Sequence, residues 1–274
     1  MRIAYILISL VVITFSTGCQ YGKTMKKGTN EDKLELARKL YDKGDFLRSQ
    51  VLLDQLIGKF QRGGQAEEVY FMYAYTYYGT NDYVMAAYHF NNFVERYPMS
   101  KKYTEEAAFM VAKCAYQRSM PSELDQSNTK KAIEAVQLFI NKYPQSVLVA
   151  EGNNLIDELR ARLHEKVFNQ ALMYYKMESY NSSYTMFKNA VIDYPDLPEK
   201  ERAEFYIAKS AFLYAQSSVK TAQEERYLNA IDHLDEYLAT YPEGEHVREA
   251  NQLKKKSNAA LADLKNKNTT TNLQ

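Results

Sequence analysis

The sequence predicts an all-α protein in which about five helix pairs stack into a solenoid that a last helix caps. Three observations lead to this fold class. Only 10 Gly and 6 Pro occur in 274 residues, which favours helices over many short strands joined by turns. Four Tyr-Pro pairs recur along the chain at intervals of 46, 51 and 47 residues. Each ends a stretch whose apolar residues have helical spacing, such as NAIDHLDEYLATYP.

The first element is a targeting segment. Arg2 precedes the apolar stretch IAYILISLVVITF, which is as long as a signal-peptide core but shorter than the roughly 18 to 20 residues that span a bilayer. Ser-Thr-Gly-Cys then resembles a bacterial lipobox, with Ser16 where leucine is usual. We therefore expect residues 1–18 to be a lipoprotein signal peptide and Cys19 to be the acylated N-terminus. An ordinary secretory signal that ends near a cysteine is the alternative.

Residues 19–30 are polar and are expected to form a flexible tether from the lipidated cysteine. Acyl chains contribute about 0.8 kcal/mol per buried methylene group, so two or three of them hold a protein on a membrane. Gln20 stands where an Asp retains many lipoproteins at the inner membrane, which favours the periplasmic face of the outer membrane. Cys114 would be the one thiol left, so no intramolecular disulfide could form.

Residues 31–265 are predicted to hold the helix pairs. The aromatic run EEVYFMYAYTYY places Tyr70, Tyr73 and Tyr77 at i, i+3 and i+7, so it is predicted to be the first helix of a pair. A turn signal such as Gly44-Asp45-Phe46 separates the two helices, and Pro ends the second. The predicted pairs lie near 31–62, 66–99, 103–145, 162–196 and 201–243, with a capping helix near 245–265.

Insertions between helices are predicted at 118–130 and 216–226, and residues 266–274 are expected to be a disordered tail. One pair cannot bury its apolar face alone, so the neighbouring pairs must supply the partner surface. Helix, short turn, second helix with a small residue, and terminal Pro resemble the tetratricopeptide pattern. The predicted fold class is therefore a tetratricopeptide repeat solenoid.

The first three repeats carry a more specific resemblance. The stretches KGDFLRSQVLLDQLIGKF, NDYVMAAYHFNNFVERYP and YPMSKKYTEEAAF are similar to the BamD family of tetratricopeptide lipoproteins in the outer-membrane β-barrel assembly machine. The resemblance covers roughly residues 31–243 and is weakest in the last two repeats, where Gln170 replaces an apolar residue. It implies that a BamA-like barrel subunit, other assembly-machine subunits and unfolded β-barrel precursors are partners. We expect the last two repeats and the 216–226 insertion to carry much of the BamA contact.

The five first helices share two positions. One is always large and apolar, and the position seven residues later is nearly always Tyr, so both are either core or groove. The apolar position is occupied by Leu34, Phe71, Phe109, Phe168 and Phe205. The position between them changes from copy to copy, as Arg38, Tyr75, Lys113, Leu172 and Lys209.

The variable position predicts a binding groove in the first three repeats, because it faces the concave surface in tetratricopeptide arrays. Precursor segments that end in an aromatic residue and a free carboxylate would suit such a groove, since aromatic rings stack and Lys or Arg binds the anion. Basic residues on an ordinary solvated helix face are the alternative. The candidate groove residues are Arg38, Tyr41, Tyr75, Tyr78, Lys113 and Tyr116.

Charge and motifs argue against other function classes. Lys plus Arg (35) balances Asp plus Glu (34), so the chain lacks the basic footprint of a nucleic-acid-binding protein. The four histidines lack metal-ligand spacing, and no G-x-S-x-G or phosphate-binding glycine loop occurs. We therefore predict a non-enzyme without metal or cofactor. Its rivals are another periplasmic tetratricopeptide scaffold, for envelope or cell-division coordination, and a SusD-like glycan-binding lipoprotein, a class that is typically much longer.

Overall fold

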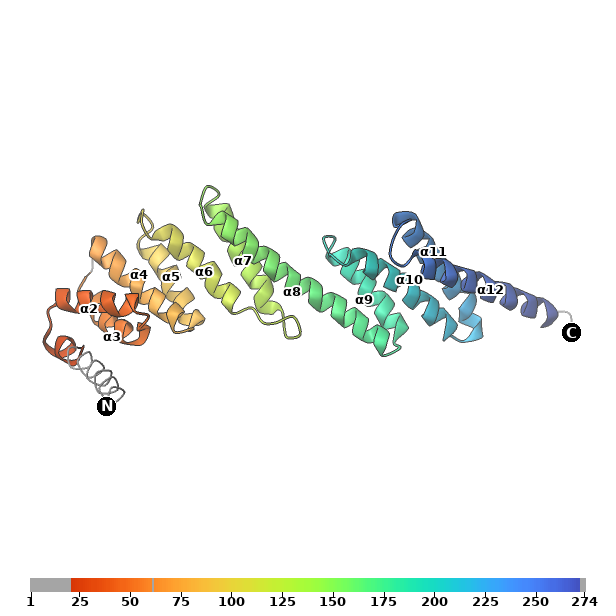
Figure 1. Ribbon diagram of the computed structural model, residues 1–274, viewed down its shortest axis with the longest axis horizontal. Coiled ribbons are helices and arrows are strands. Elements are labelled where there is room, and N and C mark those ends of the chain that lie inside the picture. Colours follow the sequence, from red (N-terminus) through yellow and green to blue (C-terminus); the bar gives the residue numbers. More distant parts are fainter. Residues whose placement is uncertain (1–20, 61, 272–274) are drawn as a thin grey trace, which may run out of the picture. The chain divides into compact units, whose positions relative to one another are not determined.

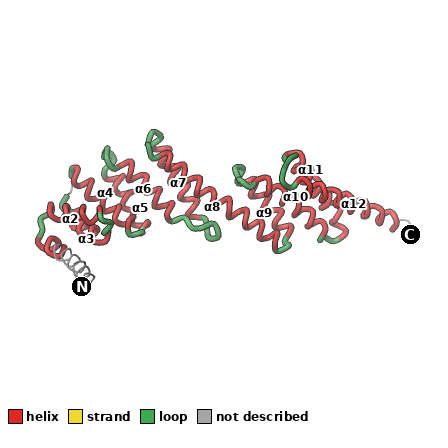
Figure 2. Tube along the Cα trace, viewed as in Figure 1, coloured by secondary structure: helices red, strands yellow, loops and turns green. Residues whose placement is uncertain are grey.

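The computed structural model describes residues 21–60 and 62–271, and the regular secondary structure in these ranges is helical (Figures 1 and 2). The described residues form two compact units, one made of those up to 120 with 124–159, the other of residues 121–123 with 160–271. The predicted fold class, a tetratricopeptide solenoid of about five helix pairs with a capping helix, is confirmed.

Three helix pairs make up most of the first unit. The pairs are α2 (Asn30–Asp42) with α3 (Phe46–Ile57), α4 (Gly64–Gly79) with α5 (Tyr83–Arg96), and α6 (Thr104–Gln117) with α7 (Ser127–Lys142). Within this unit each helix packs on the next along the chain (Figure 1). The first half of α8 (Val149–Lys176) covers the third pair, because Leu155 shares a buried cluster with Phe109 and Phe139.

The second unit repeats the arrangement. The end of α8 pairs with α9 (Tyr180–Asp193), α10 (Lys200–Gln216) pairs with α11 (Lys220–Thr240), and α12 (Val247–Thr271) covers the last pair. Phe168 of α8 packs with Phe187 of α9 in one cluster. Leu253 of α12 joins Leu234 of α11 in another, so α12 supplies the apolar surface that the last pair lacks.

The turn signals separate the two helices of a pair through local backbone conformation and capping. Gly44 and Asn81 adopt the left-handed backbone conformation that a tight turn requires, with φ of 74° and 61°. The Asp that follows each one caps the second helix: the Asp45 and Asp82 side chains accept hydrogen bonds from the backbone N–H of Arg48 and Met85. The turn therefore fixes where the second helix begins.

The core lies where the repeated spacing of the second helices predicts it. The small residue twelve positions before each Tyr-Pro proline is fully buried, and a large residue four positions later is buried beside it. The small residues are Ala86, Ala132, Ser183 and Ala230, and the large ones are Phe90, Val136, Phe187 and Leu234. Small residues let the two helices of a pair approach closely, and the large ones fill the space between pairs.

Residues 21–27 are helical, whereas the sequence predicts a flexible tether over 19–30. The tether prediction is wrong there because Tyr21 and Met25, one turn apart, pack against the core of the first pair. The helix α12 likewise extends to Thr271, past the predicted start of a disordered tail at 266. The predicted signal peptide and Cys19 lie outside the described residues. No described helix has the length and apolar character needed to cross a membrane.

The predicted insertions are shorter than expected. The loop that begins after α6 ends at Ser127, where α7 starts. Most of the stretch 216–226 is the beginning of α11, which therefore has 21 residues where α9 has 14. Arg226 contacts α10 from this extension, because its guanidinium lies 4.0 Å from the centre of the Tyr214 ring in a cation–π interaction. The polar composition of this stretch hides the start of the helix from a reading of the sequence.

Candidate functional site

A pocket of about 400 Å³ opens in the first unit between α4, α6 and the start of α8. Its apolar lining comes from Phe109 and Met110 of α6 and from Val147 and Leu148, which immediately precede α8. Its charged lining is balanced, with three lysines and three glutamates: Lys101, Lys102, Lys113, Glu105, Glu106 and Glu151. Of the six predicted groove residues, Tyr75 and Lys113 line this pocket.

Tyr75 lies between two repeats. Its hydroxyl donates a hydrogen bond to Glu106 Oε1 (2.9 Å) and lies 3.3 Å from the Met110 sulfur. Burial, reinforced by the negative charge of Glu106, raises the pKa of Tyr75, so the phenol stays protonated as a donor. The Tyr75 hydroxyl is therefore held by α6, and the ring forms part of the wall of the pocket.

Lys113 is an ion-pair partner as well as a pocket residue. Its ammonium lies 2.9 Å from Glu151 Oε1 in the first turn of α8, and 5.8 Å from the centre of the Phe109 ring. Both side chains remain partly exposed, at 28% and 45%. A ligand carboxylate that used Lys113 would therefore have to compete with Glu151.

Arg38, the third variable residue, lies outside the pocket lining. It donates two hydrogen bonds of 2.7 Å to the two carboxylate oxygens of Glu68 at the start of α4. This charge-assisted pair holds the pKa of Glu68 below its usual range. Arg38 thus ties the first pair to the second.

The same kind of contact recurs in all three pairs of the first unit. In the first unit the variable position of each first helix reaches a glutamate near the start of a later helix: Arg38 to Glu68, Tyr75 to Glu106 and Lys113 to Glu151. We call these three contacts the glutamate ties. The adjacent Glu67 and Glu105 serve another purpose, because they accept hydrogen bonds from Ser100 (2.7 Å) and Ser146 (2.5 Å), which follow the second helices.

The predicted groove tyrosines are half-buried and contact one another edge to face. The Tyr75 ring lies 6.2 Å, centre to centre, from both Tyr41 and Tyr78. Burial raises the pKa of Tyr41 to about 12. Tyr116 is placed separately and donates its hydroxyl hydrogen bond to Glu158 of α8. The apolar position seven residues earlier is buried in all five helices, so that position is core.

Lys101 and Lys102 are the pocket residues that the repeat alignment misses. They lie in the loop between α5 and α6, outside the aligned helices. No described carboxylate forms an ion pair with either, and the Lys102 ammonium lies 4.7 Å from the centre of the Tyr103 ring. Their signal in the sequence is the dipeptide KK in YPMSKKYTEE, which immediately precedes an acidic helix start. Among the described residues no group of His, Cys, Asp and Glu is arranged to hold a metal ion.

A family model described as outer membrane lipoprotein, YfiO, matches residues 28–216. No curated protein sequence matches the chain significantly. The TPR2AB domain of yeast Sti1 in its pHSP90 complex is 14% identical, with a TM-score of 0.40 over 84% of this chain and 98% of that chain. A thermophilic TPR protein of Thermus thermophilus is 14% identical, with a TM-score of 0.33 over 85% of this chain and 100% of that chain. These scores are low, so the repeat fold rests on the chain's own helix pairs.

Proposed function

Because the chain belongs to the outer membrane lipoprotein family YfiO, we propose that it is the BamD-type lipoprotein of a β-barrel assembly machine. In this role Cys19 carries the lipid and the repeats face the periplasm. The chain acts as a scaffold that docks on a BamA-like subunit and receives unfolded barrel precursors. The observation that supports precursor binding is the pocket at Tyr75, which lies within the matched residues and combines aromatic, apolar and basic side chains.

The pocket suits a segment that ends in an aromatic residue with a free carboxylate. The aromatic side chain would lie on Phe109, Met110 and Leu148, which supply apolar surface. The carboxylate would bind Lys101 and Lys102, whose charges no described ion pair neutralises, rather than Lys113, which Glu151 already holds. This assignment moves the predicted anion contact from the variable helix position to the loop before α6.

Titration of a peptide that ends in an aromatic residue tests this site. A charge-assisted contact contributes about 1.5 to 3 kcal/mol where it is shielded from water and less where it is exposed. We therefore expect Lys101→Glu with Lys102→Glu to weaken binding about tenfold or more, and amidation of the peptide to have a similar effect. Tyr75→Ala should also weaken binding, because it removes part of the wall.

The matched control is Lys130→Glu with Lys131→Glu on the exposed face of α7, which changes the net charge equally. Circular dichroism must show the same helix content in all variants. Equal affinity of the wild type and the Lys101 and Lys102 variant for the free-acid peptide would rule out this pocket as the carboxylate site.

The second unit supplies the proposed contact with the BamA-like subunit. Val219, at the turn between α10 and α11, is 70% exposed, and Leu228 of α11 is 51% exposed. A contiguous exposed apolar patch is typical of a surface that a partner covers, and we propose that these two residues belong to one. Val219→Glu with Leu228→Glu should reduce recovery of the barrel subunit in detergent extracts. Ile192→Glu on α9, which is 64% exposed, is the control, and equal recovery with both variants would contradict this contact.

The anchor has its own test. Replacing Cys19 with Ser removes the thiol that acylation requires, so the protein should move from the membrane fraction to the soluble periplasmic fraction. Mass spectrometry of the wild type should show the added acyl mass on Cys19. Membrane association of the Cys19→Ser variant, together with a wild type of unmodified mass, would overturn the lipoprotein anchor.

A further inference from the structure

The helical segment 21–27 is built into the first repeat. Tyr21 and Met25 pack against the buried cluster that α2, α3 and α4 share. The guanidinium of Arg48 lies 5.7 Å from the centre of the Tyr21 ring, and the Gln55 amide donates a hydrogen bond to the Met25 sulfur (3.7 Å). The segment is therefore held to α3 by two residues one turn apart, and its orientation on the repeat is fixed.

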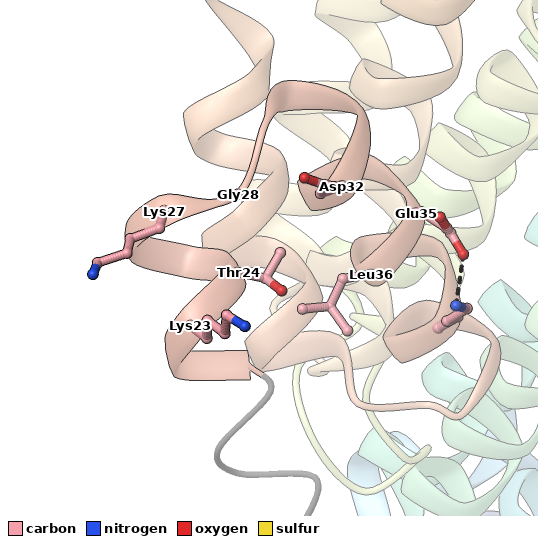
Figure 3. A pocket seen from close by; sticks show the side chains of 8 residues that line it. Lys23, Thr24, Lys27, Gly28, Asp32, Glu35 and Leu36 are labelled. Carbon is pink, nitrogen blue, oxygen red and sulfur yellow. Dashed lines mark hydrogen bonds and ion pairs between the residues drawn. The ribbon is translucent and has the colours of Figure 1, made fainter.

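The opposite face of this segment is basic. Lys23, Lys26 and Lys27 follow the i, i+3, i+4 spacing and are all exposed, while Tyr21 and Met25 occupy the other side of the helix. Lys23 and Lys27 line a pocket of about 370 Å³ against α2 (Figure 3). In Figure 3 the Lys27 side chain points away from α2.

The carboxylates across this pocket are already engaged. Asp32 accepts a hydrogen bond from the backbone N–H of Thr29, and Glu35 pairs with Lys39 at 2.6 Å. No ion pair joins Lys23, Lys26 or Lys27 to a described carboxylate. The charges of the three exposed lysines are therefore not neutralised by an ion pair within the described residues.

The lipid attachment point is close to this face by covalent geometry. Cys19 is two residues before Tyr21, a reach of at most about 7 Å. The helical segment adds about 1.5 Å per residue, so Lys27 lies within roughly 16 Å of the acylated residue along the chain. With such a short connection, the lysine face cannot move far from the membrane surface.

We propose that Lys23, Lys26 and Lys27 form a membrane-contact face that binds the anionic headgroups of the lipid leaflet in which Cys19 is anchored. This inference rests on the proposed anchor at Cys19. The docked helix then holds the first repeat against the leaflet in one orientation. A flexible tether would instead let the repeats move freely. Each lysine near an anionic surface strengthens binding about fivefold, so the three together contribute roughly a hundredfold.

A singly alkylated protein makes this contribution measurable. The mature chain from Cys19 is purified without lipid, and one myristoyl-length chain is attached chemically to Cys19. Burial raises the pKa of the Cys114 thiol to about 12, so Cys114 stays protonated and Cys19 reacts alone. A single chain of this length binds membranes only marginally, on the order of 10⁴ M⁻¹, which leaves the lysine contribution visible.

Sedimentation with phosphatidylcholine vesicles, with and without phosphatidylglycerol, gives the affinities. We expect about hundredfold tighter binding to the anionic vesicles, and a loss of most of this gain at high salt. The variant Lys23→Gln, Lys26→Gln, Lys27→Gln should bind both kinds of vesicle with the affinity that the wild type shows for pure phosphatidylcholine. The control variant Lys130→Gln, Lys131→Gln, Lys142→Gln loses the same charge from α7 and should keep the preference.

Equal affinity of the wild type for both vesicles overturns the proposal, as does an equal loss in the two triple variants. Unchanged vesicle binding together with lost recovery of assembly subunits would assign the lysines to a protein partner and overturn it as well. Because the acyl chain is attached chemically, none of these results depends on whether cells acylate Cys19. Failure of the anchor itself appears separately, in the fractionation of the Cys19→Ser variant.

Discussion

The variable helix position is polar in all three pairs of the first unit. In the second unit it is apolar between the fourth and fifth pairs and polar again where Lys209 of α10 lies 2.8 Å from Glu249 of α12. In the first three pairs it carries the glutamate ties, for example Arg38 to Glu68. Between the fourth and fifth pairs it is Leu172, which packs in the cluster of Phe168 and Phe187. The residue that matches Glu68 there is Arg202, whose guanidinium lies 4.9 Å from the centre of the Phe168 ring.

This difference indicates that stacking and recognition depend on different positions of the first helices. The repeats stack in both units because the apolar position of each first helix is buried, whatever the variable position carries. The variable position is therefore available for other chemistry. In the first unit it takes part in the pocket at Tyr75, and between the fourth and fifth pairs it closes the seam with apolar and ring contacts.

The largest effects should come from the buried phenylalanines that both units share. Phe205→Ala and Phe109→Ala each remove a ring that is at most 2% exposed, and each should lower the free energy of unfolding by about 3 to 5 kcal/mol. Because Phe109 also lines the pocket, its variant should lose affinity for the aromatic peptide even well below its melting temperature. Denaturant unfolding and peptide titration measure the two effects. Equal peptide affinity of both variants would show that the first-unit pocket is not the binding site.

An intermediate effect is expected from transferring the polar tie to the seam between the fourth and fifth pairs. Leu172→Lys removes apolar packing from the seam between the fourth and fifth pairs and should cost about 1 to 3 kcal/mol. Adding Arg202→Glu creates the charge partner and should recover part of that loss, on the order of 0.5 kcal/mol.

Urea unfolding of the two single variants and the double variant gives the coupling energy. Lys113→Leu, the reverse exchange in the first unit, is the matched comparison. If Leu172→Lys is neutral, the seam tolerates either chemistry and its contrast with the glutamate ties has no energetic basis.

The sequence predicts the helix pairs well because their signals are local. Apolar spacing, the Asp that caps α3 and α5, and the Tyr-Pro pair that follows α5, α7, α9 and α11 all act within a few residues. The turn at Glu178 lacks that signal, although it adopts the same left-handed conformation (φ 59°) as Asn81. The glutamate ties could not be predicted, because their partners lie 30 or more residues apart and meet only through the register of stacking. The same reason hides the helix at 21–27, which Tyr21 and Met25 hold by long-range packing.

The smallest predicted effect belongs to the Arg38–Glu68 tie itself. The pair is partly exposed, at 40% and 25%, so water screens it, and its coupling energy should be about 0.5 to 1 kcal/mol despite two short hydrogen bonds. The pKa of Glu68 is lowered in the folded state, so this stabilisation is present above the unfolded value of 4.5 and is lost as pH falls through the folded pKa. A double-mutant cycle with Arg38→Ala and Glu68→Gln, measured at pH 7 and again at acidic pH, tests both statements. A coupling energy that persists at acidic pH would mean that the contact holds without the carboxylate charge. The polar seams of the first unit would then depend on packing, as the apolar seam at Leu172 does.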